Sequence, residues 1–330
     1  MDLEGARLVS SRLGDRLRAA VKGRDDVIEL ILVALIADGH VLLEDYPGSG
    51  KTTLAKTLGD SIADDLPDDE IAGFRRVQFT PDLLPSDVTG VTIFDGAQNR
   101  FFFRRGPIFA YVLLADEINR TSPKVQSALL EAMAEKQVTV DNETHPLDEL
   151  FFVIATQNPL DLAGTYPLPV AQLDRFLFKI RMENVSREAE LDVLLTARQR
   201  REGVPESLPR VSRAEVVAAR HACHELVYIA PAIHEALVDV ARALRADPRV
   251  HQGASTRSLV MALPALQARA MIHGRDHVAP ADVEALLGPL FRHRLELASD
   301  GDDGAPIIVA AAKPGLERLA RHRLDRRRRD

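Results

Sequence analysis

The chain has 330 residues, a length that predicts about two domains at roughly 150 residues each. Hydrophobic residues make up 46% and charged residues 28%, and the net charge of −7 argues against a protein that coats nucleic acid. The single cysteine, Cys223, excludes a disulfide framework and a cysteine-rich metal site. Because the sequence has neither an apolar run near ~20 residues nor a signal-peptide pattern, we expect no membrane insertion and a cytoplasmic location.

Short apolar segments in the first half of the chain predict five buried β-strands, since most are bounded by Gly, Pro or Asp. The five segments are 40–44, 76–79, 111–115, 151–155 and 176–180. Apolar residues at helical spacing predict helices at 27–37, 51–62 and 123–135. This alternation is typical of a parallel sheet covered by helices. We therefore predict an α/β fold with a five-stranded parallel sheet sandwiched by helices.

Two β-hairpins are predicted as insertions into this α/β region. They surround the turn dipeptides Asp95-Gly96 and Asp141-Asn142, each flanked by short β-type runs. The first hairpin includes three consecutive phenylalanines, 101–103. Successive side chains of a strand point to opposite faces, so these three cannot share one buried face.

Beyond Met182 the pattern becomes helical. Helices are predicted at 186–200, 212–228, 231–246, 258–273 and 280–287. We therefore expect an α/β domain at 1–185, a smaller all-α domain at 186–299 and a loosely ordered basic tail at 300–330. Residues 313–330 hold eight basic and three acidic side chains, and like charges repel, which suggests a solvated segment.

The strongest motif is Pro47-Gly48-Ser49-Gly50-Lys51-Thr52-Thr53, which follows a predicted strand and opens a predicted helix. Glycines in such a loop let backbone N–H groups surround phosphate oxygens at the positive end of the helix dipole. We expect Lys51 to reach the β- and γ-phosphates and the Thr52 hydroxyl to bind Mg²⁺. A strict phosphate-binding loop begins with glycine where this chain has Asp45.

A second motif is the apolar strand 111–115, which ends in Asp116 and Glu117. The pattern is common on its own, but the phosphate-binding loop about 65 residues upstream gives it meaning. Asp116 is expected to hold Mg²⁺, largely through water, and Glu117 to orient and activate an attacking water. Together the two motifs predict Mg²⁺-dependent ATP hydrolysis.

Three further polar residues complete the pattern. Asn158 lies at the end of another predicted strand, where its side chain can contact a γ-phosphate, although Asn-Pro is also an ordinary turn. Arg175 is a candidate arginine finger, which neutralises charge on a departing γ-phosphoryl group, although Asp174-Arg175 also fits a surface ion pair. Arg257 begins a helix of the second domain.

In this order, the five elements resemble the AAA+ ATPases, and specifically the MoxR family of the helix-2-insert group. The resemblance covers roughly residues 20–297. It rests on strings that look like the family nearly word for word, including 78–87, 115–120, 126–133 and 171–176.

The resemblance implies a P-loop AAA+ domain followed by a helical lid, with ATP and Mg²⁺ as cofactors. By position, Lys51 and Thr52 match Walker A, Asp116 and Glu117 Walker B, Asn158 sensor one, Arg175 the finger acting on a neighbour's ATP, and Arg257 sensor two. The expected nucleotide-binding residues are Asp45, Pro47, Gly48, Ser49, Gly50, Lys51, Thr52, Thr53 and Asp116, with Thr52 and Asp116 as the Mg²⁺ ligands.

Family members look like hexameric, chaperone-like ATPases that remodel or activate partners, often proteins with von Willebrand factor A-type domains. The resemblance therefore implies a ring of copies of this chain and a protein client, with nucleic acid not expected as a partner. Loops like the two hairpins face the pore or the client in related ring motors. Asp45, Val170 and Thr256 depart from the family pattern, but none of them replaces a catalytic group.

Two alternatives stay open at this stage. One is the ATPase motor subunit of a chelatase-like metal-insertion complex, because the magnesium chelatase ATPase resembles the same group. The other is an ATP-binding switch or scaffold with little turnover. Glu117, Asn158 and Arg175 argue against a pure switch, because a switch does not need all three.

Overall fold

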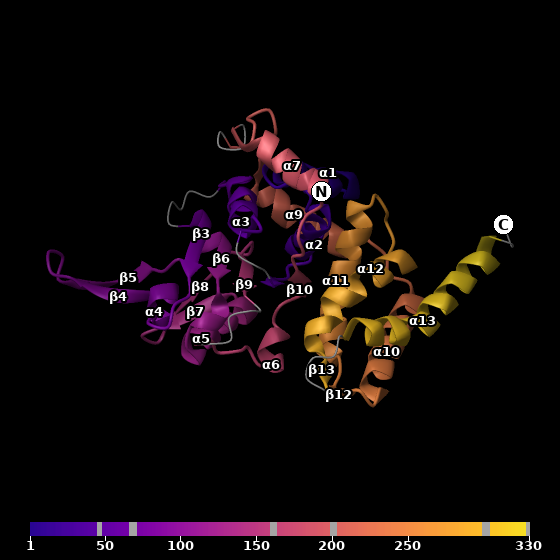
Figure 1. The fold of residues 1–330 in the computed structure, drawn as a ribbon. Helices are drawn as coiled ribbons and strands as arrows, with labels where there is room; N and C mark the ends of the chain where they lie inside the picture. The colour runs from indigo at the N-terminus through magenta and orange to yellow at the C-terminus, as the bar shows by residue number, and fades with distance from the viewer. Residues whose placement is uncertain (45–47, 66–70, 159–163, 199–202, 299–303, 328–330) are drawn as a thin grey trace.

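The computed structural model describes residues 1–330 except 45–47, 66–70, 159–163, 199–202, 299–303 and 328–330, and beyond residue 321 it describes only the backbone (Figure 1). At its centre is a five-stranded parallel sheet in the order β10-β1-β9-β6-β3. The strands are β1 (Val41–Glu44), β3 (Ala72–Gln78), β6 (Ala110–Asp116), β9 (Phe152–Gln157) and β10 (Phe178–Arg181). The predicted α/β fold class and all five predicted strands are confirmed.

The sheet separates two apolar cores. Neighbouring residues of one strand enter opposite cores, since Leu113 packs into one and Leu114 into the other. One face is covered by α1 (Leu3–Ala20), α2 (Asp25–Ile36) and α3 (Lys51–Asp60), and the other by α4 (Pro85–Thr89) and α5 (Pro123–Glu135). All seven residues of β6 are buried, which explains its uninterrupted apolar run.

Helix α1 is an element that the sequence patterns left unassigned. Asp2 caps it by accepting a hydrogen bond from the Gly5 N–H at 2.8 Å. Its apolar stripe, Ala6, Val9, Leu13 and Leu17, is buried in the core shared with α2 and α9. The N-terminal residues therefore pack against helices from the far half of the chain.

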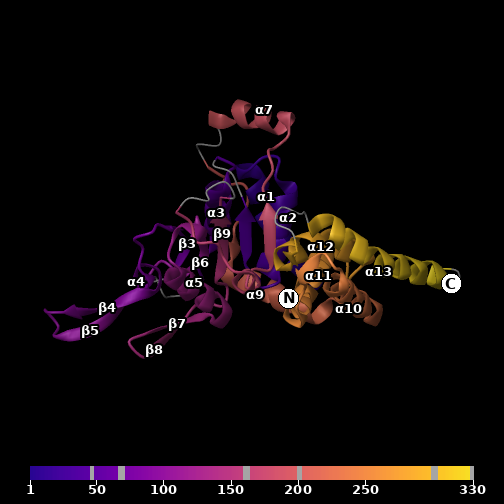
Figure 2. The same ribbon diagram turned by 60° about the horizontal axis from the view of Figure 1, so that its bottom comes forward.

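The two antiparallel hairpins expected from the sequence are present, and both project from the body in Figure 2, whereas only the first stands clear of it in Figure 1. The first consists of β4 (Gly90–Asp95) and β5 (Arg100–Arg105), and the second of β7 (Gln137–Val140) and β8 (Glu143–Pro146). Phe94 and Phe101 contact each other on the first hairpin, with ring centroids 5.0 Å apart, yet they are 50% and 71% exposed.

The second half is almost entirely helical. Its main helices are α7 (Arg187–Leu195), α9 (Arg213–Leu226), α10 (Pro231–Ala246), α11 (Thr256–Ile272) and α12 (Pro280–Phe291). Shorter elements of the helical region are β11 (Val211–Ser212), β12 (Val250–Gln252) paired with β13 (Glu296–Leu297), and the 3₁₀ turn Arg292–Arg294. The α/β region adds β2 (Ile62–Ala63), which pairs with β11, the 3₁₀ turn Ile118–Arg120 and α6 (Val170–Leu173). Helix α7 stands apart from the other helices at the top of Figure 2. The domain limit at residue 185 stays a prediction.

The expectation of a loosely ordered tail from residue 300 is wrong for most of that segment. Gly304–Arg327 form helix α13, which packs against α10 and α12. Ile307, Ile308, Ala312 and Leu319 are buried along it. Their spacing is helical, but the basic composition and two prolines concealed it in the sequence. None of the helices described has the length and apolar character needed to cross a bilayer.

Candidate nucleotide site

Four neighbouring strands of the sheet end in polar residues at one edge. Glu44 ends β1, Gln157 ends β9, Asp116 ends β6 and Gln78 ends β3. The parallel registers pair Glu44 with Gln157 and Gln78 with Asp116, so the four side chains share the carboxyl edge. In open α/β sheets this edge is where ligands bind.

The phosphate-binding motif leads from β1 into α3 at the same edge. Asp45 and Pro47 lie outside the described residues. Gly48 and Gly50 both have φ +93°, which residues with a side chain rarely adopt. Helix α3 begins at Lys51, so Thr52 and Thr53 lie in its first turn, whose backbone N–H groups have no partner within the helix. The geometry required of an anion-binding helix start is present.

A cleft of about 590 Å³ borders this loop. Gly48, Ser49, Gly50 and Thr53 form part of its wall. The remaining wall is built by Val21, Lys22, Arg24, Met182, Glu183, Asn184, Val185, Glu190, Val193 and Leu194. A wall that combines a polar loop with apolar side chains suits a ligand with both an anionic and an apolar part.

Asp116 lies beside Lys51 at the end of β6. The Lys51 Nζ is 3.5 Å from the Asp116 Oδ1, and the Asp116 side chain is only 4% exposed. The Thr156 hydroxyl donates to Oδ1 at 2.7 Å, and the Arg76 Nη2 donates to Oδ2 at 2.7 Å. Burial raises the pKa of Asp116, but the hydrogen bonds from Thr156 and Arg76 and the charge of Lys51 outweigh it and hold the pKa below its ordinary value. The carboxylate is therefore ionised and able to attract a cation.

Glu117 follows Asp116 in a left-handed conformation, with φ +58°. Its backbone N–H donates to the Thr156 hydroxyl at 2.9 Å. The Gln78 Nε2 donates to the Glu117 Oε2 at 2.6 Å, and the Arg120 Nε lies 3.4 Å from the same oxygen. The carboxylate is thus oriented by two neighbours rather than free to rotate.

Sequence reasoning did not single out Thr156, Arg76 or Gln78. Thr156 contacts both members of the Asp116-Glu117 pair, and the other two contact one member each. Their position at or near the ends of predicted strands could have marked them as site candidates, because those strands are adjacent to β6. Only the strand order shows that those ends are neighbours.

The other predicted site residues occupy three different places. Asn158 directly follows β9 at the carboxyl edge. Arg175 lines a separate cleft of about 500 Å³ together with Glu131 and Glu135, and its Nη1 donates to the Leu130 carbonyl at 3.2 Å. Arg257 is exposed in the first turn of α11. The structure therefore gathers Lys51, Asp116 and Glu117, whereas neither Arg175 nor Arg257 lines the cleft at the phosphate-binding loop.

Comparisons with known proteins agree with this geometry. Residues 40–178 match the family model of the ATPase family associated with various cellular activities, and residues 242–309 match the AAA lid domain. The chain is 45% identical to the uncharacterized protein YeaC of Bacillus subtilis over 93% of this chain and 95% of that protein. It is 38% identical to the chaperone MoxR1 of Mycobacterium tuberculosis, covering 89% of this chain and 78% of the relative.

A solved structure supports the same fold. The crystal structure of a candidate ATPase from Cytophaga hutchinsonii superposes with a TM-score of 0.82 at 34% identity, covering 94% of this chain and 96% of that one. The α/β domain and the helical region are therefore arranged in this chain much as in a solved relative.

Proposed function

This chain belongs to the MoxR family of AAA+ ATPases, and from that premise we propose that it hydrolyses ATP with Mg²⁺ in a ring of identical subunits and so remodels or activates a protein partner. ATPase activity in general follows from the family. The observation that carries the finer proposal is the position of Lys51 beside Asp116 and Glu117 at the carboxyl edge of the sheet, directly after the loop whose Gly48, Ser49 and Gly50 line the cleft.

The residues present fit Mg²⁺-ATP. A Cβ at Gly48 would meet no atom within 4 Å, so the space beside this residue of the loop is open. Thr52 and Asp116 offer the hard oxygen ligands that Mg²⁺ prefers. Within the described ranges, no group of three or more His, Cys, Asp or Glu residues forms a ready-made metal cage. This agrees with an ion held by one carboxylate together with substrate phosphates and water.

The proposed chemistry is transfer of the γ-phosphoryl group to water. Bound Mg²⁺ would neutralise charge on the phosphates. Glu117 orients the water and accepts its proton, Lys51 balances negative charge on the phosphates, and Asn158 contacts the γ-phosphate. Gln78 and Arg120 fix the direction of the Glu117 carboxylate.

In the proposed ring, a neighbouring subunit supplies a further positive charge at the γ-phosphate. Arg175 lines a cleft that shares no lining residue with the nucleotide cleft, so the finger of one subunit would act on the ATP of its neighbour. Arg257, at the start of α11, would sense the same nucleotide from the lid. Hydrolysis therefore depends on assembly.

Phosphate release by the wild-type chain and by Glu117→Gln tests the enzymatic part of this proposal. Removal of a general base is expected to lower the rate by about 10²–10⁴-fold. ATP binding should persist, because Lys51 and the loop are unchanged. If the wild-type chain binds ATP but releases no phosphate at any concentration, the chain is an ATP-dependent switch or scaffold instead.

A mixing experiment tests the ring. Arg175→Ala should lose about 10³-fold or more of the rate, because an arginine finger contributes at least that much. Adding Lys51→Ala subunits, which retain Arg175, should restore phosphate release. A wild-type rate per subunit that does not rise with protein concentration contradicts the ring.

The partner is identified by capture. Glu117→Gln is expected to hold ATP and retain its client, which the family resemblance suggests carries a von Willebrand factor A-type domain. Lys51→Ala serves as the matched control. Capture of chelatase subunits instead favours the metal-insertion alternative.

A further inference from the structure

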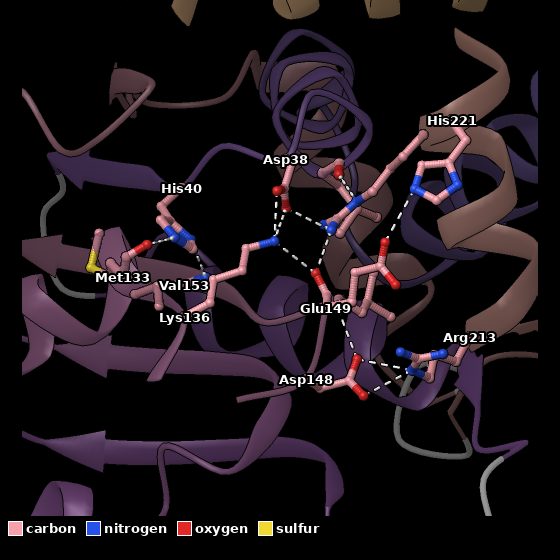
Figure 3. Close-up of polar contacts among 12 residues, drawn as sticks. Asp38, His40, Met133, Lys136, Asp148, Glu149, Val153, Arg213 and His221 are labelled. Carbon is pink, nitrogen blue, oxygen red and sulfur yellow. Dashed lines mark hydrogen bonds and ion pairs between the residues drawn. The ribbon is translucent and has the colours of Figure 1, made fainter. Parts of the chain in front are cut away.

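Hydrogen bonds and ion pairs attach the residues at both ends of the hairpin β7–β8 to the amino edge of the sheet (Figure 3). This edge lies opposite the nucleotide site. The base of the hairpin is closed by the Leu147 N–H, which donates to the Lys136 carbonyl at 2.8 Å. The Lys136 Nζ lies 2.7 and 2.6 Å from the two carboxylate oxygens of Asp38, which follows α2. The same Nζ donates to the Glu149 carbonyl at 2.9 Å, just beyond the hairpin.

Helix α9 also forms an ion pair and a hydrogen bond with the residues that follow the hairpin (Figure 3). The Nε of Arg213, the first residue of α9, lies 2.9 Å from both oxygens of Asp148. These side chains are only 16% and 5% exposed, so water screens the pair weakly. Further along α9, the Arg220 Nη1 donates to the Asp38 Oδ1 at 2.6 Å and to the Glu149 carbonyl at 2.8 Å.

The start of α9 is in turn bound to the end of α3, the helix that begins at Lys51. The fully buried Ser61 ends α3, and its carbonyl accepts from the Val211 N–H at 3.0 Å. Next, β2 pairs in parallel with β11, which leads directly into α9. The Ala214 N–H donates to the Asp65 Oδ2 at 2.8 Å. The end of α3 and the first turn of α9 are therefore in direct contact through backbone and side-chain hydrogen bonds.

The last contact joins the two hairpins. The rings of Phe103 on β5 and His145 on β8 stack with centroids 3.8 Å apart and planes 12° apart. Beyond this stack, β4–β5 extends into solvent with Phe94 and Phe101 exposed. The ring stack therefore connects β7–β8 to the hairpin that carries the exposed Phe94 and Phe101.

We propose that helix α9 relays the state of the nucleotide site from α3 to both inserted hairpins, through the Arg213–Asp148 ion pair and the Phe103–His145 ring stack. The proposal rests on the proposed function, because it requires that the start of α3 binds ATP. Closely packed elements move as units or switch between discrete arrangements rather than deform continuously. The relay gives each ATP-binding event a direct mechanical path to the surface that would contact a client.

Hydrogen exchange of the hairpin amides tests the relay. The full chain is compared without nucleotide and with Mg²⁺ and adenylyl imidodiphosphate, a non-hydrolysable ATP analogue. We expect the exchange rates of residues 90–105 and 137–147 to change by about fivefold or more on binding, which corresponds to a coupling of roughly 1 kcal/mol.

Arg213→Met should abolish this change in both hairpins while nucleotide binding persists. Arg12→Met is the matched control, because Arg12 also forms an ion pair with α9, to Glu215 at 3.3 Å, but lies off the path. The control should keep the full response. Persistence of the response in Arg213→Met overturns the relay.

His145→Ala removes the ring stack with Phe103, which is the last contact of the relay. This test does not depend on whether Arg213→Met folds. Residues 137–147 should still respond to nucleotide, whereas 90–105 should not. His145→Phe, which keeps an aromatic stack, should restore the response of 90–105. Equal responses of both hairpins in His145→Ala overturn the relay.

Displacement of a fluorescent ATP analogue, measured on the same samples, separates the two proposals. If wild type binds nucleotide but neither hairpin responds, the relay alone is overturned. If wild type does not bind nucleotide, the proposed function fails and the relay fails with it.

Discussion

At the carboxyl edge of the sheet the two ion pairs of Asp116 are long or half exposed, whereas the Arg213–Asp148 pair at the amino edge is short and largely buried. The Lys51–Asp116 pair spans 3.5 Å, and the Arg76 side chain that also binds Asp116 is 47% exposed. The Arg213–Asp148 pair spans 2.9 Å with both side chains at most 16% exposed. In the Arg220–Asp38 pair, the arginine is 6% exposed and the aspartate 43%.

The difference shows how similar residues serve two purposes in one sheet. A loosely paired lysine next to a cleft can exchange its partner for a phosphate without leaving a buried charge unpaired. A tightly paired arginine inside the protein cannot, so it attaches elements to one another. Strand order alone does not distinguish these uses, but distance and burial do.

The largest expected effect is on the activity of the carboxyl edge. Lys51→Ala should lower ATP hydrolysis by about 10²–10³-fold, because it removes a positioned charge from the phosphates. The free energy of unfolding should change little, since Asp116 keeps Thr156 and Arg76 as partners. Phosphate release and urea unfolding measure the two quantities. A Lys51→Ala chain with wild-type turnover would remove Lys51 from the site.

The amino edge should respond in the opposite way. Arg220→Ala should lower the free energy of unfolding by about 2 kcal/mol, because it removes three hydrogen bonds that a buried guanidinium donates. The acceptors are the Leu35 and Glu149 carbonyls and the Asp38 carboxylate. Urea unfolding measures the loss, and phosphate release well below the melting temperature should remain measurable. A loss under 1 kcal/mol contradicts the attachment role.

The buried imidazole of His40 should make the amino edge sensitive to acid. The Val153 N–H donates to its Nδ1 at 3.1 Å, so Nε2 carries the proton and donates to the Met133 carbonyl at 3.2 Å (Figure 3). Burial is the main cause that lowers the pKa of His40 from 6.5 to about 4.

The unfolded chain therefore binds a proton on His40 before the folded chain does, and stability falls as the pH drops from about 6.5 toward 4. Between pH 7 and pH 5 the contribution of His40 is a loss of about 2 kcal/mol. Urea unfolding across this range measures it. His40→Gln, which keeps a donor and an acceptor but does not titrate, should show a flatter pH dependence. An unchanged slope contradicts the assignment.

The smallest expected effect sharpens the contrast between the edges. Arg76→Met removes an arginine–aspartate pair like those of the amino edge, but from a half-exposed position. The free energy of unfolding should fall by about 1 kcal/mol or less, because exposed ion pairs contribute little. Urea unfolding of Arg76→Met beside Arg220→Ala gives the comparison directly. Equal losses would show that burial does not separate the two edges.

Much of the fold could be predicted because its signals are local. The five strands are short apolar runs, and the turn at Asp95-Gly96 marks the first hairpin. Helix α13 was missed because its buried stripe, including Ile307 and Leu319, is diluted by charged residues. That stripe is stable only because α10 and α12 cover it.

The residues of the candidate site could be predicted where they belong to a local motif. Lys51, Thr52, Asp116 and Glu117 belong to compact motifs whose spacing carries the chemistry. Arg76 and Gln78 lie about 40 residues from the carboxylates they contact, and no pattern near them in the sequence predicts those contacts. The β3–β6 register brings them together.

By itself, the sequence determined most of the helices and strands, the phosphate-binding motif and the polar residues that end the strands, since each depends on neighbours within a few positions. Only the tertiary structure decided which charged side chains pair loosely at the carboxyl edge and which pair tightly, as Arg213 and Asp148 do, at the amino edge. The physical reason is that burial and pairing depend on residues far apart in the chain, such as Asp38 with Arg220. Another distant pair, Arg213 with Asp148, attaches helix α9 to the end of the hairpin β7–β8.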